Sequence, residues 1–492
     1  MRLIELIEEE KGTNEDAVDI TGLTSNSREV KPGYLFAALP GNNVKGTDYI
    51  PEALSRGAKA ILVPSSSRID TSNFNSSVLI KDNNPRQRLA KLAARFFKRQ
   101  PSYIAAITGT NGKTSTAVFL RELWLECGVN AGSLGTLGEE SDGNSIKTKL
   151  TTPDPITLHQ SLDRQAGHNV THCVIEASSH GLDQYRLDGV SVSAGAFLNL
   201  TRDHLDYHIN MDAYLKSKAR LFNEVMEPNQ DVVLNGDSPY VSAISKICHK
   251  SNHREILFGC GEGDIRLIER NIEGFNQNIK LELLGKNYNL NIAFPGALQI
   301  YNLMAAAGLA IVSGMKTDDI AEGMTKLTCA RGRMDLVARL NNGASIFIDY
   351  AHTPDALSTV LKDLRNLTNN NLVVVFGCGG NRDAGKRPEM GRIASDLADI
   401  VFITDDNPRL ECPESIRREI ISACPNSREI GMRKNAICEA IRALKENDIL
   451  LIAGKGHEQG QNIGGKVIPF DDRKVALDQV AFMNKSTIIS ST

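Results

Sequence analysis

Ile107-Thr108-Gly109-Thr110-Asn111-Gly112-Lys113-Thr114-Ser115 is the stretch that decides the fold of this 492-residue chain. An apolar run, Tyr103 to Ile107, precedes it, and a run typical of a helix, Thr116 to Cys127, follows it. A strand, a glycine loop and a helix start in this order form a phosphate cradle. The glycines let backbone N–H groups turn toward the anion, and the helix N-terminus adds positive charge. Lys113 can reach the terminal phosphates, and the Thr114 hydroxyl can bind Mg²⁺.

The loop departs from the general P-loop pattern at one position, because Ile107 stands where the first glycine would be. A plain glycine turn ahead of a helix is the weaker alternative. The stretch therefore predicts a protein that uses ATP or GTP.

Length and composition limit the class of protein. At about 150 residues a domain, the chain has room for about three domains, each with its own core. The net charge of −3 lacks the basic excess of a nucleic-acid binder. Nine scattered cysteines without a C-x-x-C pair favour small buried thiols in a reducing compartment over zinc ligands. No apolar run approaches transmembrane length. We expect a cytoplasmic monomer that does not bind nucleic acid and does not insert into a membrane.

Strand-like and helix-like runs alternate through three units, which we place at residues 1–100, 101–328 and 329–492. In the first, an acidic amphipathic helix at Met1–Glu10 precedes strands at Tyr34–Ala38, Ala60–Val63 and Val78–Lys81 and helices at Tyr49–Arg56 and Pro85–Arg99. In the second, strands at Cys173–Glu176, Ala194–Leu198 and Asp231–Asn235 follow the P-loop, with helices at Met211–Met226 and Tyr301–Val312.

The third unit has the same alternation, with strands at Ser345–Asp349, Leu372–Phe376, Ile400–Thr404 and Asp448–Ala453 and helices at Pro388–Leu397, Glu414–Ala423 and Asn435–Glu446. It lacks the G-x-G-x-x-G fingerprint, so NAD is not inferred. The pattern predicts an α/β protein of three domains. These are a small N-terminal α/β domain, a central P-loop domain with a doubly wound, mostly parallel sheet, and a C-terminal Rossmann-like domain.

Glu176 and His204 each follow a predicted strand of the second unit. Ligands of α/β sheets bind at the carboxyl ends of the strands, so both side chains are expected beside the phosphate loop. Each alone could be a helix cap or an ion-pair partner. Together, a carboxylate and an imidazole at this place favour a divalent metal site.

Two lysines follow on the next predicted helix. At about 100° per residue, Lys216 and Lys218 point to nearly opposite faces, and Lys218 shares its face with Tyr214, Leu221 and Phe222. A lysine on an inward face needs a partner. An ion pair with an acid is the simpler explanation. The other is carbamylation by CO₂, which would turn Lys218 into an anionic metal ligand.

Four motifs together resemble the Mur ligases, the ATP-dependent amide ligases of peptidoglycan precursor synthesis. They are Gly109-Thr-Asn-Gly-Lys-Thr114, Glu176-Ala-Ser-Ser-His-Gly-Leu182, Asp203-His-Leu-Asp-Tyr-His208 and Asp349-Tyr-Ala-His-Thr-Pro-Asp-Ala-Leu357. The resemblance covers nearly the whole chain. It is strongest to the enzymes that add the third residue to UDP-N-acetylmuramoyl-L-Ala-D-Glu through an acyl phosphate. It implies a UDP-substrate-binding domain, a central ATPase domain, a C-terminal amino-acid-binding ligase domain, ATP as co-substrate and Mg²⁺.

The resemblance also implies roles for individual residues. Catalytic positions of the family match Lys113, Lys218, Glu176 and His204, with Lys218 at the carbamylated lysine, and metal positions match Thr114, Glu176, His204 and Lys218. ATP-binding positions match Gly109, Thr110, Asn111, Gly112, Lys113, Thr114, Ser115, Asn302, Arg333 and Asp349. Positions for UDP-muramoyl-dipeptide match Ser25, Ser27, Asn42, Asn43, Val44, Thr151, Thr152, Ser178, Gln184 and Arg186. One departure is Leu298-Gln299, where the family commonly has Phe-Asn.

The run Asp406-Asn407-Pro408-Arg409 bears on which amino acid is added. Family members that add meso-diaminopimelate resemble this form, whereas lysine-adding relatives lack the arginine. Diaminopimelate differs from lysine by one carboxylate beside the distal amine, which a guanidinium can hold with two parallel N–H donors. Arg382 is a second candidate cation, Glu458 a candidate acceptor for the distal ammonium, and Gly454 lies in the same motif as Glu458. Loop ion pairs are the alternative, although arginines brought together without a bound carboxylate would repel.

The expected reaction is therefore the ATP-dependent addition of meso-diaminopimelate to UDP-N-acetylmuramoyl-L-Ala-D-Glu, with His352 or Asp349 as candidates to orient or deprotonate the amine. Two rivals remain at this point. A folylpolyglutamate synthase would share the ATPase core, but the N-terminal unit and Asp406-Asn-Pro-Arg409 argue against it. A non-catalytic nucleotide-dependent regulator would be free to lose Lys113, Glu176, His204 and Lys218.

Overall fold

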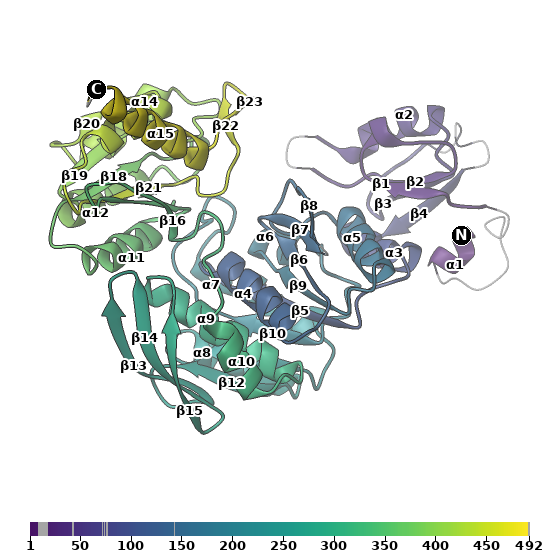
Figure 1. The fold of residues 1–492 in the computed structure, drawn as a ribbon. Helices are drawn as coiled ribbons and strands as arrows, with labels where there is room; N and C mark the ends of the chain where they lie inside the picture. The colour runs from purple at the N-terminus through teal and green to yellow at the C-terminus, as the bar shows by residue number, and fades with distance from the viewer. Residues whose placement is uncertain are drawn as a thin grey trace.

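The computed structural model describes residues 1–7, 18–41, 44–70, 72, 74, 77–141 and 143–490, the side chains of 485–490 excepted. Three separate sheets, each wrapped by helices, form three lobes, with the central lobe between the other two (Figure 1). A small hairpin forms a fourth sheet. The fold is the α/β arrangement that the sequence predicts. The exact domain boundaries near residues 100 and 328 stay predictions.

The N-terminal lobe contains one four-stranded parallel sheet in the order β1-β2-β3-β4. Its elements are α1 (Leu3–Ile7), β1 (Gly22–Thr24), β2 (Tyr34–Ala37), α2 (Ile50–Ser55), β3 (Ala60–Pro64), β4 (Val78–Asp82) and α3 (Pro85–Phe96). Helix α3 begins at Asn84, whose side chain accepts a hydrogen bond from the Gln87 amide, with Pro85 at the first helical position. Residues 8–10 of the predicted first helix lie outside the described residues.

The central lobe is built on an eleven-stranded sheet in the order β15-β14-β13-β12-β11-β10-β5-β9-β6-β7-β8. Its middle is parallel, and antiparallel arms extend it at both edges. Strands are β5 (Tyr103–Thr108), β6 (Ala131–Gly135), β7 (Gly138–Ser141), β8 (Asn144–Ile146), β9 (His172–Glu176), β10 (Ala194–Phe197), β11 (Asp231–Asn235), β12 (Arg254–Gly259), β13 (Ile265–Glu273), β14 (Asn276–Leu283) and β15 (Lys286–Ile292). Helices are α4 (Lys113–Glu126), α5 (Pro155–Gly167), α6 (Ser179–Asp183), α7 (Met211–Arg220), α8 (Val241–Lys250), α9 (Ala297–Val312) and α10 (Thr317–Met324).

Strand β5 shows why this sheet is covered on both faces. Ala105 and Ile107 belong to the apolar core on the side of α4 and α9, whereas Ile104 and Ala106 belong to the core on the opposite side. Successive side chains of a strand point to opposite faces, so an uninterrupted apolar strand requires helices on both. This central burial fixes the P-loop at the carboxyl end of β5.

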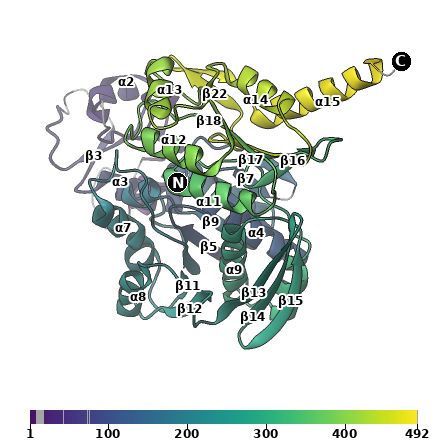
Figure 2. The same cartoon turned by 90° about the vertical axis from the view of Figure 1, so that its left-hand side faces the viewer.

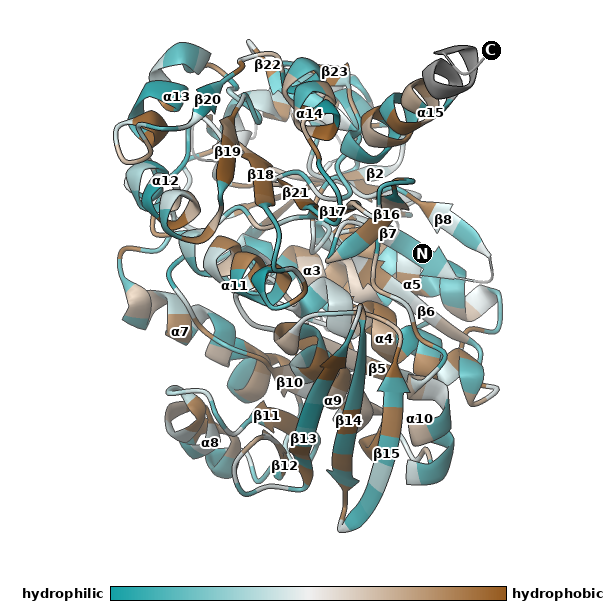
Figure 3. Cartoon of the chain, turned by 60° about the vertical axis from the view of Figure 1, so that its left-hand side comes forward, coloured by the Kyte–Doolittle hydropathy of each residue, from teal (hydrophilic) through white to brown (hydrophobic). Residues whose placement is uncertain are grey.

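The C-terminal lobe repeats the design with a six-stranded sheet in the order β16-β17-β21-β18-β19-β20. The inner strands are strongly hydrophobic (Figure 3). Strands are β16 (Asp335–Arg339), β17 (Ser345–Asp349), β18 (Leu372–Phe376), β19 (Ile400–Ile403), β20 (Arg428–Glu429), β21 (Ile449–Ala453) and the hairpin β22 (Gly460–Ile463) and β23 (Lys466–Pro469). Helices are α11 (Pro354–Arg365), α12 (Lys386–Leu397), α13 (Pro413–Ile421), α14 (Arg433–Arg442) and α15 (Asp472–Ser490), which runs outward from the lobe (Figure 2).

Two predictions of the elements need correction. The single helix predicted over Met211–Met226 ends as an α-helix at Arg220 and continues as a π-turn over Leu221–Val225. The antiparallel arm β13–β15 and the hairpin β7–β8 were not predicted. All nine cysteines are free, and within the described ranges no helix is long and apolar enough to cross a bilayer.

Candidate active site

The P-loop forms the floor of a pocket between the central and C-terminal lobes. Gly112 adopts φ = 91°, and a Cβ there would lie 2.2 Å from Asn302 Oδ1 on α9, so only glycine fits. Helix α4 begins at Lys113, which places Thr114 and Ser115 in its first turn with free backbone N–H groups. Six of the seven predicted P-loop residues, 110–115, line the pocket, whereas Gly109 does not.

Two lysines donate to one backbone carbonyl at the base of the loop. Lys113 Nζ lies 2.8 Å from Gly109 O and 2.9 Å from Thr110 O, and Lys218 Nζ lies 2.8 Å from the same Gly109 O. Lys218 is 1% exposed, whereas Lys216 is exposed, as predicted. Burial lowers the pKa of Lys218 well below that of a free lysine, and the neighbouring Lys113 lowers it further.

The ion pair that would be the simpler explanation for the buried Lys218 is not formed within the part of the chain that the structure describes. No acid among the described residues lies within ion-pair distance of its Nζ, which instead lies 4.5 Å from the centre of the Tyr214 ring. Burial likewise lowers the pKa of Lys113. Two buried amines beside each other, without a carboxylate partner, constitute a site that is incomplete until an anion binds.

Glu176 lies at the end of β9, on the strand next to β5. Its Oε2 accepts hydrogen bonds from Thr114 Oγ1 at 2.9 Å and Thr136 Oγ1 at 3.1 Å, and its Oε1 accepts one from the Thr136 amide at 2.7 Å. These three donors fix a buried carboxylate beside the first turn of α4. Gly135 makes room for it, because a Cβ there would lie 2.2 Å from Glu176 Oε1.

His204 lies beside Asp203 after β10, in the left-handed region with φ = 54°. Its Nε2 is 3.4 Å from Asp203 Oδ2, and its ring is perpendicular to that of His180 at 4.8 Å. Burial lowers the pKa of His204 to about 3, so the imidazole is neutral and can act as a metal ligand. A strained backbone at a polar residue in a pocket is typical of a functional position.

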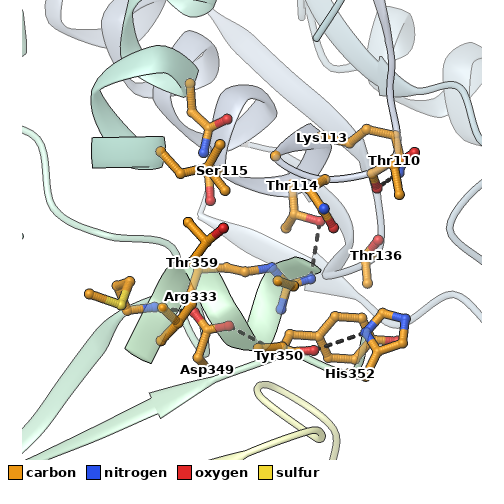
Figure 4. Close-up of a pocket in the computed structure, with 18 of the residues that line it drawn as sticks. Thr110, Lys113, Thr114, Ser115, Thr136, Arg333, Asp349, Tyr350, His352 and Thr359 are labelled. Atoms are coloured by element: carbon orange, nitrogen blue, oxygen red, sulfur yellow. Dashed lines mark hydrogen bonds between the residues drawn. The ribbon is translucent and has the colours of Figure 1, made fainter. Parts of the chain in front are cut away.

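The C-terminal lobe closes the pocket with Arg333, Asp349, Tyr350 and His352 (Figure 4). Arg333 Nη2 lies 3.3 Å from Thr114 Oγ1, and its guanidinium lies 4.3 Å from the centre of the Tyr350 ring. Asp349 accepts hydrogen bonds from the Met334 and Ala351 amides, each at 2.7 Å. Burial nevertheless raises the pKa of Asp349. Asp349 thus holds the turn that carries Tyr350 and His352.

Asn302 is held by a hydrogen bond although the chain has Leu298-Gln299 where the family commonly has Phe-Asn. Gln299 Oε1 accepts a hydrogen bond of 3.1 Å from Asn302 Nδ2, and both residues line the pocket. The amide side chain at position 299 therefore supports the asparagine that faces Gly112.

A second pocket adjoins the first and shares Asp203, His204, Tyr350 and His352 with it. Its other lining residues include all the residues predicted to bind diaminopimelate except Pro408: Arg382, Asp406, Asn407, Arg409, Gly454 and Glu458. Glu458 Oε2 accepts from Asn407 Nδ2 at 2.9 Å, and Arg409 Nη1 donates to Gly380 O at 2.8 Å. The pocket therefore brings together both predicted arginines and both predicted acids, beside the further acids Asp203, Asp206 and Asp383.

The charges of this second pocket are only partly balanced. Burial lowers the pKa of Arg409, and the neighbouring Arg382 lowers it further. Asp406 Oδ2 is buried without a hydrogen-bond partner and faces Gly454, where a Cβ would lie 2.8 Å from it. Arg409 itself adopts φ = 54°. Arg382 Nη1 lies 3.6 Å from Asp206 Oδ2 and is therefore paired, so the groups that a zwitterionic ligand could complete are the unpaired Asp406 acceptor and the Arg409 guanidinium.

The predicted contacts to the muramoyl-dipeptide fall into two groups. In the central lobe, Thr152 Oγ1 lies 2.6 Å from Glu176 O and 2.9 Å from Ser178 Oγ, and Arg186 bonds both Thr152 O at 2.6 Å and Gln184 Oε1 at 2.7 Å. Thr151 Oγ1 lies 3.1 Å from Thr136 Oγ1. These residues form one hydrogen-bonded cluster beside Glu176.

The N-terminal group is not brought to the two pockets. Ser27 donates to Glu52 Oε2 at 2.6 Å, while Ser25 and Val44 are exposed. Asn42 and Asn43 lie outside the described residues.

The donor set at Glu176 fits Mg²⁺. The described residues contain no cluster of three or more His, Cys, Asp or Glu side chains poised around one point. The buried Glu176 carboxylate and the Thr114 hydroxyl nevertheless supply the oxygen ligands that Mg²⁺ prefers, and His204 supplies a neutral nitrogen on the same pocket. A carbamate on Lys218 would add the missing negative charge.

Several pocket residues escaped prediction. Asp203 and Tyr350 lie inside motifs quoted above without a role, so their sequence signal was present. Thr136, Asp363 and Lys386 come from loops and helices whose sequence carries no comparable pattern. Lys386 Nζ donates to His352 O at 2.7 Å.

Three family models match the chain in order. They are the Mur ligase family catalytic domain at residues 19–97, the Mur ligase middle domain at 107–310 and the Mur ligase glutamate ligase domain at 332–456. The chain belongs to the Mur ligase family. Its ATPase-like pocket and its second pocket fall in the middle and glutamate ligase domains of that family.

Individual Mur ligases are similar over nearly the full length. The UDP-N-acetylmuramoyl-L-alanyl-D-glutamate–2,6-diaminopimelate ligase of Bradyrhizobium diazoefficiens is 46% identical over 474 residues, which cover 94% of this chain and 96% of the relative. The ligase of the same name from Rhizobium meliloti is 43% identical and covers 92% and 93%. A solved structure of a ligase with that name has a TM-score of 0.71 at 30% identity, covering 98% of this chain and 99% of its own.

A folylpolyglutamate synthase of Mycobacterium tuberculosis shares the fold alone. Its TM-score is 0.63 at 17% identity, over 75% of this chain and 92% of its own. The rival enzyme thus shares the fold at low sequence identity, whereas the diaminopimelate ligases are similar in sequence as well.

Proposed function

We propose that this Mur ligase joins meso-diaminopimelate to UDP-N-acetylmuramoyl-L-Ala-D-Glu at the expense of ATP, in peptidoglycan precursor synthesis. The observation that carries the proposal is the shared wall between the two pockets. One pocket contains a P-loop, the other contains Arg382, Arg409, Asp406 and Glu458, and the two meet at a wall that both share. The shared residues are Asp203, His204, Tyr350 and His352. A phosphorylated carboxylate and an attacking amine need such a junction.

The first pocket offers groups for both parts of ATP. The P-loop amides and Lys113 would bind the phosphates, and the Arg333 guanidinium would reach them from the C-terminal lobe. The lining also includes Leu298, Met334 and Val360, which suit an apolar base. Mg²⁺, held by Thr114 and Glu176, would neutralise phosphoryl charge when bound.

In the first step, the D-Glu side-chain carboxylate attacks the γ-phosphorus, and ADP leaves as the acyl phosphate forms. Lys113 and the loop amides stabilise the charge on the transferring group. Lys218 is suited to carbamylation because its amine has a lowered pKa, and only a neutral amine adds CO₂, with release of one proton. Glu176, His204 and the Lys218 carbamate would together hold a second Mg²⁺.

In the second step, the amine at the L-centre of diaminopimelate attacks the acyl carbon, and phosphate leaves. His352 is the favoured base. Its Nδ1 is 2.9 Å from Tyr350 O, which assigns the proton to Nδ1 and leaves Nε2 as an acceptor. Burial lowers the pKa of His352, which keeps the imidazole neutral. Asp349 is less suited, since both its oxygens accept from backbone amides.

Recognition of the distal end follows from charge. Arg409 and Arg382 would bind the distal carboxylate, and the ammonium would satisfy the unpaired Asp406 Oδ2 and approach Glu458. Lysine lacks that carboxylate and would leave Arg409 without a charged partner, whereas Arg382 keeps its ion pair with Asp206 at 3.6 Å. The preference for diaminopimelate over lysine is thus expected to be an electrostatic effect.

The test is phosphate release with ATP, Mg²⁺ and UDP-N-acetylmuramoyl-L-Ala-D-Glu, with meso-diaminopimelate or L-lysine added. Release that requires diaminopimelate is the expected result. Release with lysine alone would refute the assigned amino acid but keep the ligase. Folate-stimulated release, or tight ATP binding without any amino-acid-dependent release, would refute the proposed reaction.

A further inference from the structure

The segment that joins the central and C-terminal lobes carries Arg333 between two ion-pairing neighbours. Arg331, Arg333 and Asp335 alternate along residues 329–335, which we call the linker. Arg333 bonds Thr114 in the central lobe and lies over Tyr350 in the C-terminal lobe. Its position thus depends on how the linker is held.

Three consecutive residues at the start of α15 connect the linker to the second pocket, which is called the amino-acid pocket from here on because it contains the residues predicted to bind diaminopimelate. We call Asp471-Asp472-Arg473 the clamp. Asp471 Oδ2 pairs with Arg331 Nη2 at 2.7 Å, and Arg473 Nη1 donates to both oxygens of Asp335 at 2.9 and 2.7 Å. The two clamp ion pairs therefore flank Arg333 on both sides.

Asp472, the middle residue of the clamp, pairs with Arg433 on α14 rather than with the linker. Their ion pair is 2.7 Å long, and both side chains are completely buried. Arg433 Nη2 also donates to Ala453 O at 2.8 Å, next to Gly454 of the amino-acid pocket. The clamp therefore ties the linker to the floor of that pocket.

Backbone contact makes the same connection independently. Gly332 adopts φ = 70°, and a Cβ there would lie 2.4 Å from His457 N. Gly456 adopts φ = 52°, and its Cβ would lie 2.8 Å from Gly332 O. The linker thus packs directly on the loop that ends in Glu458, with no room for a side chain between them.

We propose that the clamp makes the linker part of the C-terminal lobe, so that Arg333 reaches the nucleotide only when that lobe lies against the P-loop. Arg331, Asp335, Asp471 and Arg473 are then positioning residues for ATP, acting through Arg333. Loss of a flanking ion pair removes one of the contacts that hold the linker, beside the packing of Gly332 on Gly456 and the hydrogen bond from the Met334 amide to Asp349, and so displaces the guanidinium from Thr114. The proposal rests on the proposed binding of ATP at the P-loop but not on the amino acid added.

The test is the ATP dissociation constant of Arg473→Gln in the full chain, measured with Mg²⁺ by calorimetry. We expect about tenfold weaker binding, the order of one charge-assisted hydrogen bond. The partly exposed pair contributes little to stability, so the fold is expected to persist. Arg331→Gln removes the other flanking pair and is expected to act in the same direction. Asp472 is avoided because breaking a fully buried pair endangers folding.

The matched control is Arg442→Gln, which removes an exposed pair with Glu439 on α14 and is expected to leave ATP binding unchanged. The decisive comparison is made in a protein that already carries Arg333→Ala. If the clamp acts through Arg333, adding Arg473→Gln to Arg333→Ala causes no further loss. Unchanged ATP binding in both clamp variants would overturn the proposal, as would additive losses in the double variant. Wild-type ATP binding without ligase activity would instead refute the proposed function and leave this test intact.

Discussion

Arg409 offers the sharpest test of how the amino acid is chosen. It lies in the second pocket with its Nη1 on Gly380 O at 2.8 Å, which leaves its other N–H groups for a ligand. Arg409→Ala removes the guanidinium and keeps the backbone turn, although φ = 54° remains strained for alanine as for arginine. The change therefore addresses the side chain alone.

The expected loss can be worked from the contacts. A guanidinium can give a carboxylate two charge-assisted hydrogen bonds, each contributing about 1.5–3 kcal/mol. Arg382 remains in the pocket and retains part of the attraction, and its repulsion from Arg409 is relieved. We therefore expect a loss of about 3 kcal/mol for diaminopimelate, or about two orders of magnitude in kcat/KM. Lysine has no distal carboxylate, so its low activity is expected to change little.

The assay is phosphate release with each amino acid in turn, and Arg409→Lys is the matched variant. It keeps the charge and loses the two-pronged geometry, so its loss is expected to fall between wild type and Arg409→Ala. The KM for ATP serves as the internal control, since Arg409 does not line the nucleotide pocket. An unchanged ratio of diaminopimelate to lysine activity in Arg409→Ala would refute the recognition argument.

Three further changes test the site and its scaffold. Lys218→Ala is expected to remove most turnover and keep the fold. The matched control is Lys216→Ala at an exposed position, which is expected to stay active. Near-normal turnover of Lys218→Ala in the phosphate-release assay would exclude the carbamate role. Gly112→Ala is expected to abolish ATP binding in calorimetry because its Cβ meets Asn302, while Gly128→Ala, also at positive φ but with open space around it, is expected to bind ATP. Burial lowers the pKa of His159 to about 4, so the unfolded state takes up its proton first as pH falls. The free energy of unfolding is expected to drop by about 3 kcal/mol from this residue between pH 6.5 and 4. A urea titration in which His159→Gln shows the same drop as wild type would contradict this.

Sequence reasoning reached those parts of the site that lie at the ends of strongly apolar strands. β5, β9 and β10 are buried runs, and the polar residues that follow them meet at one sheet edge as predicted. The inward face of Lys218 also followed from helical periodicity. Its partner did not, because a backbone carbonyl across 109 residues leaves no mark on the local sequence.

The features that were not predicted from the sequence were missed for two different reasons. Strand β14 carries a readable alternation in Ile279, Leu281 and Leu283, so the signal for the antiparallel arm was present. The bond from Asp363 to the Ala297 amide, 3.0 Å long, could not be predicted, because it joins helices of two lobes. Pairing between lobes depends on their docking, which periodicity does not encode.

The shared wall of the two pockets explains why the site must be assembled from two lobes. Asp203 and His204 come from the central lobe, and Tyr350 and His352 come from the C-terminal lobe. The pKa of Asp203 is lowered although burial opposes this, and Lys386 is the permanent positive charge that favours the ionised carboxylate, which lies between the two imidazoles. His352 Nε2 lies 4.0 Å from Asp203 Oδ2. In the proposed second step, the charge that develops on His352 as it takes a proton from the amine would therefore be stabilised by an acid from the opposite lobe. Separation of the lobes would then deprive the base of that stabilisation and the P-loop of Arg333, so we expect amine attack and ATP binding to depend on the same closed arrangement.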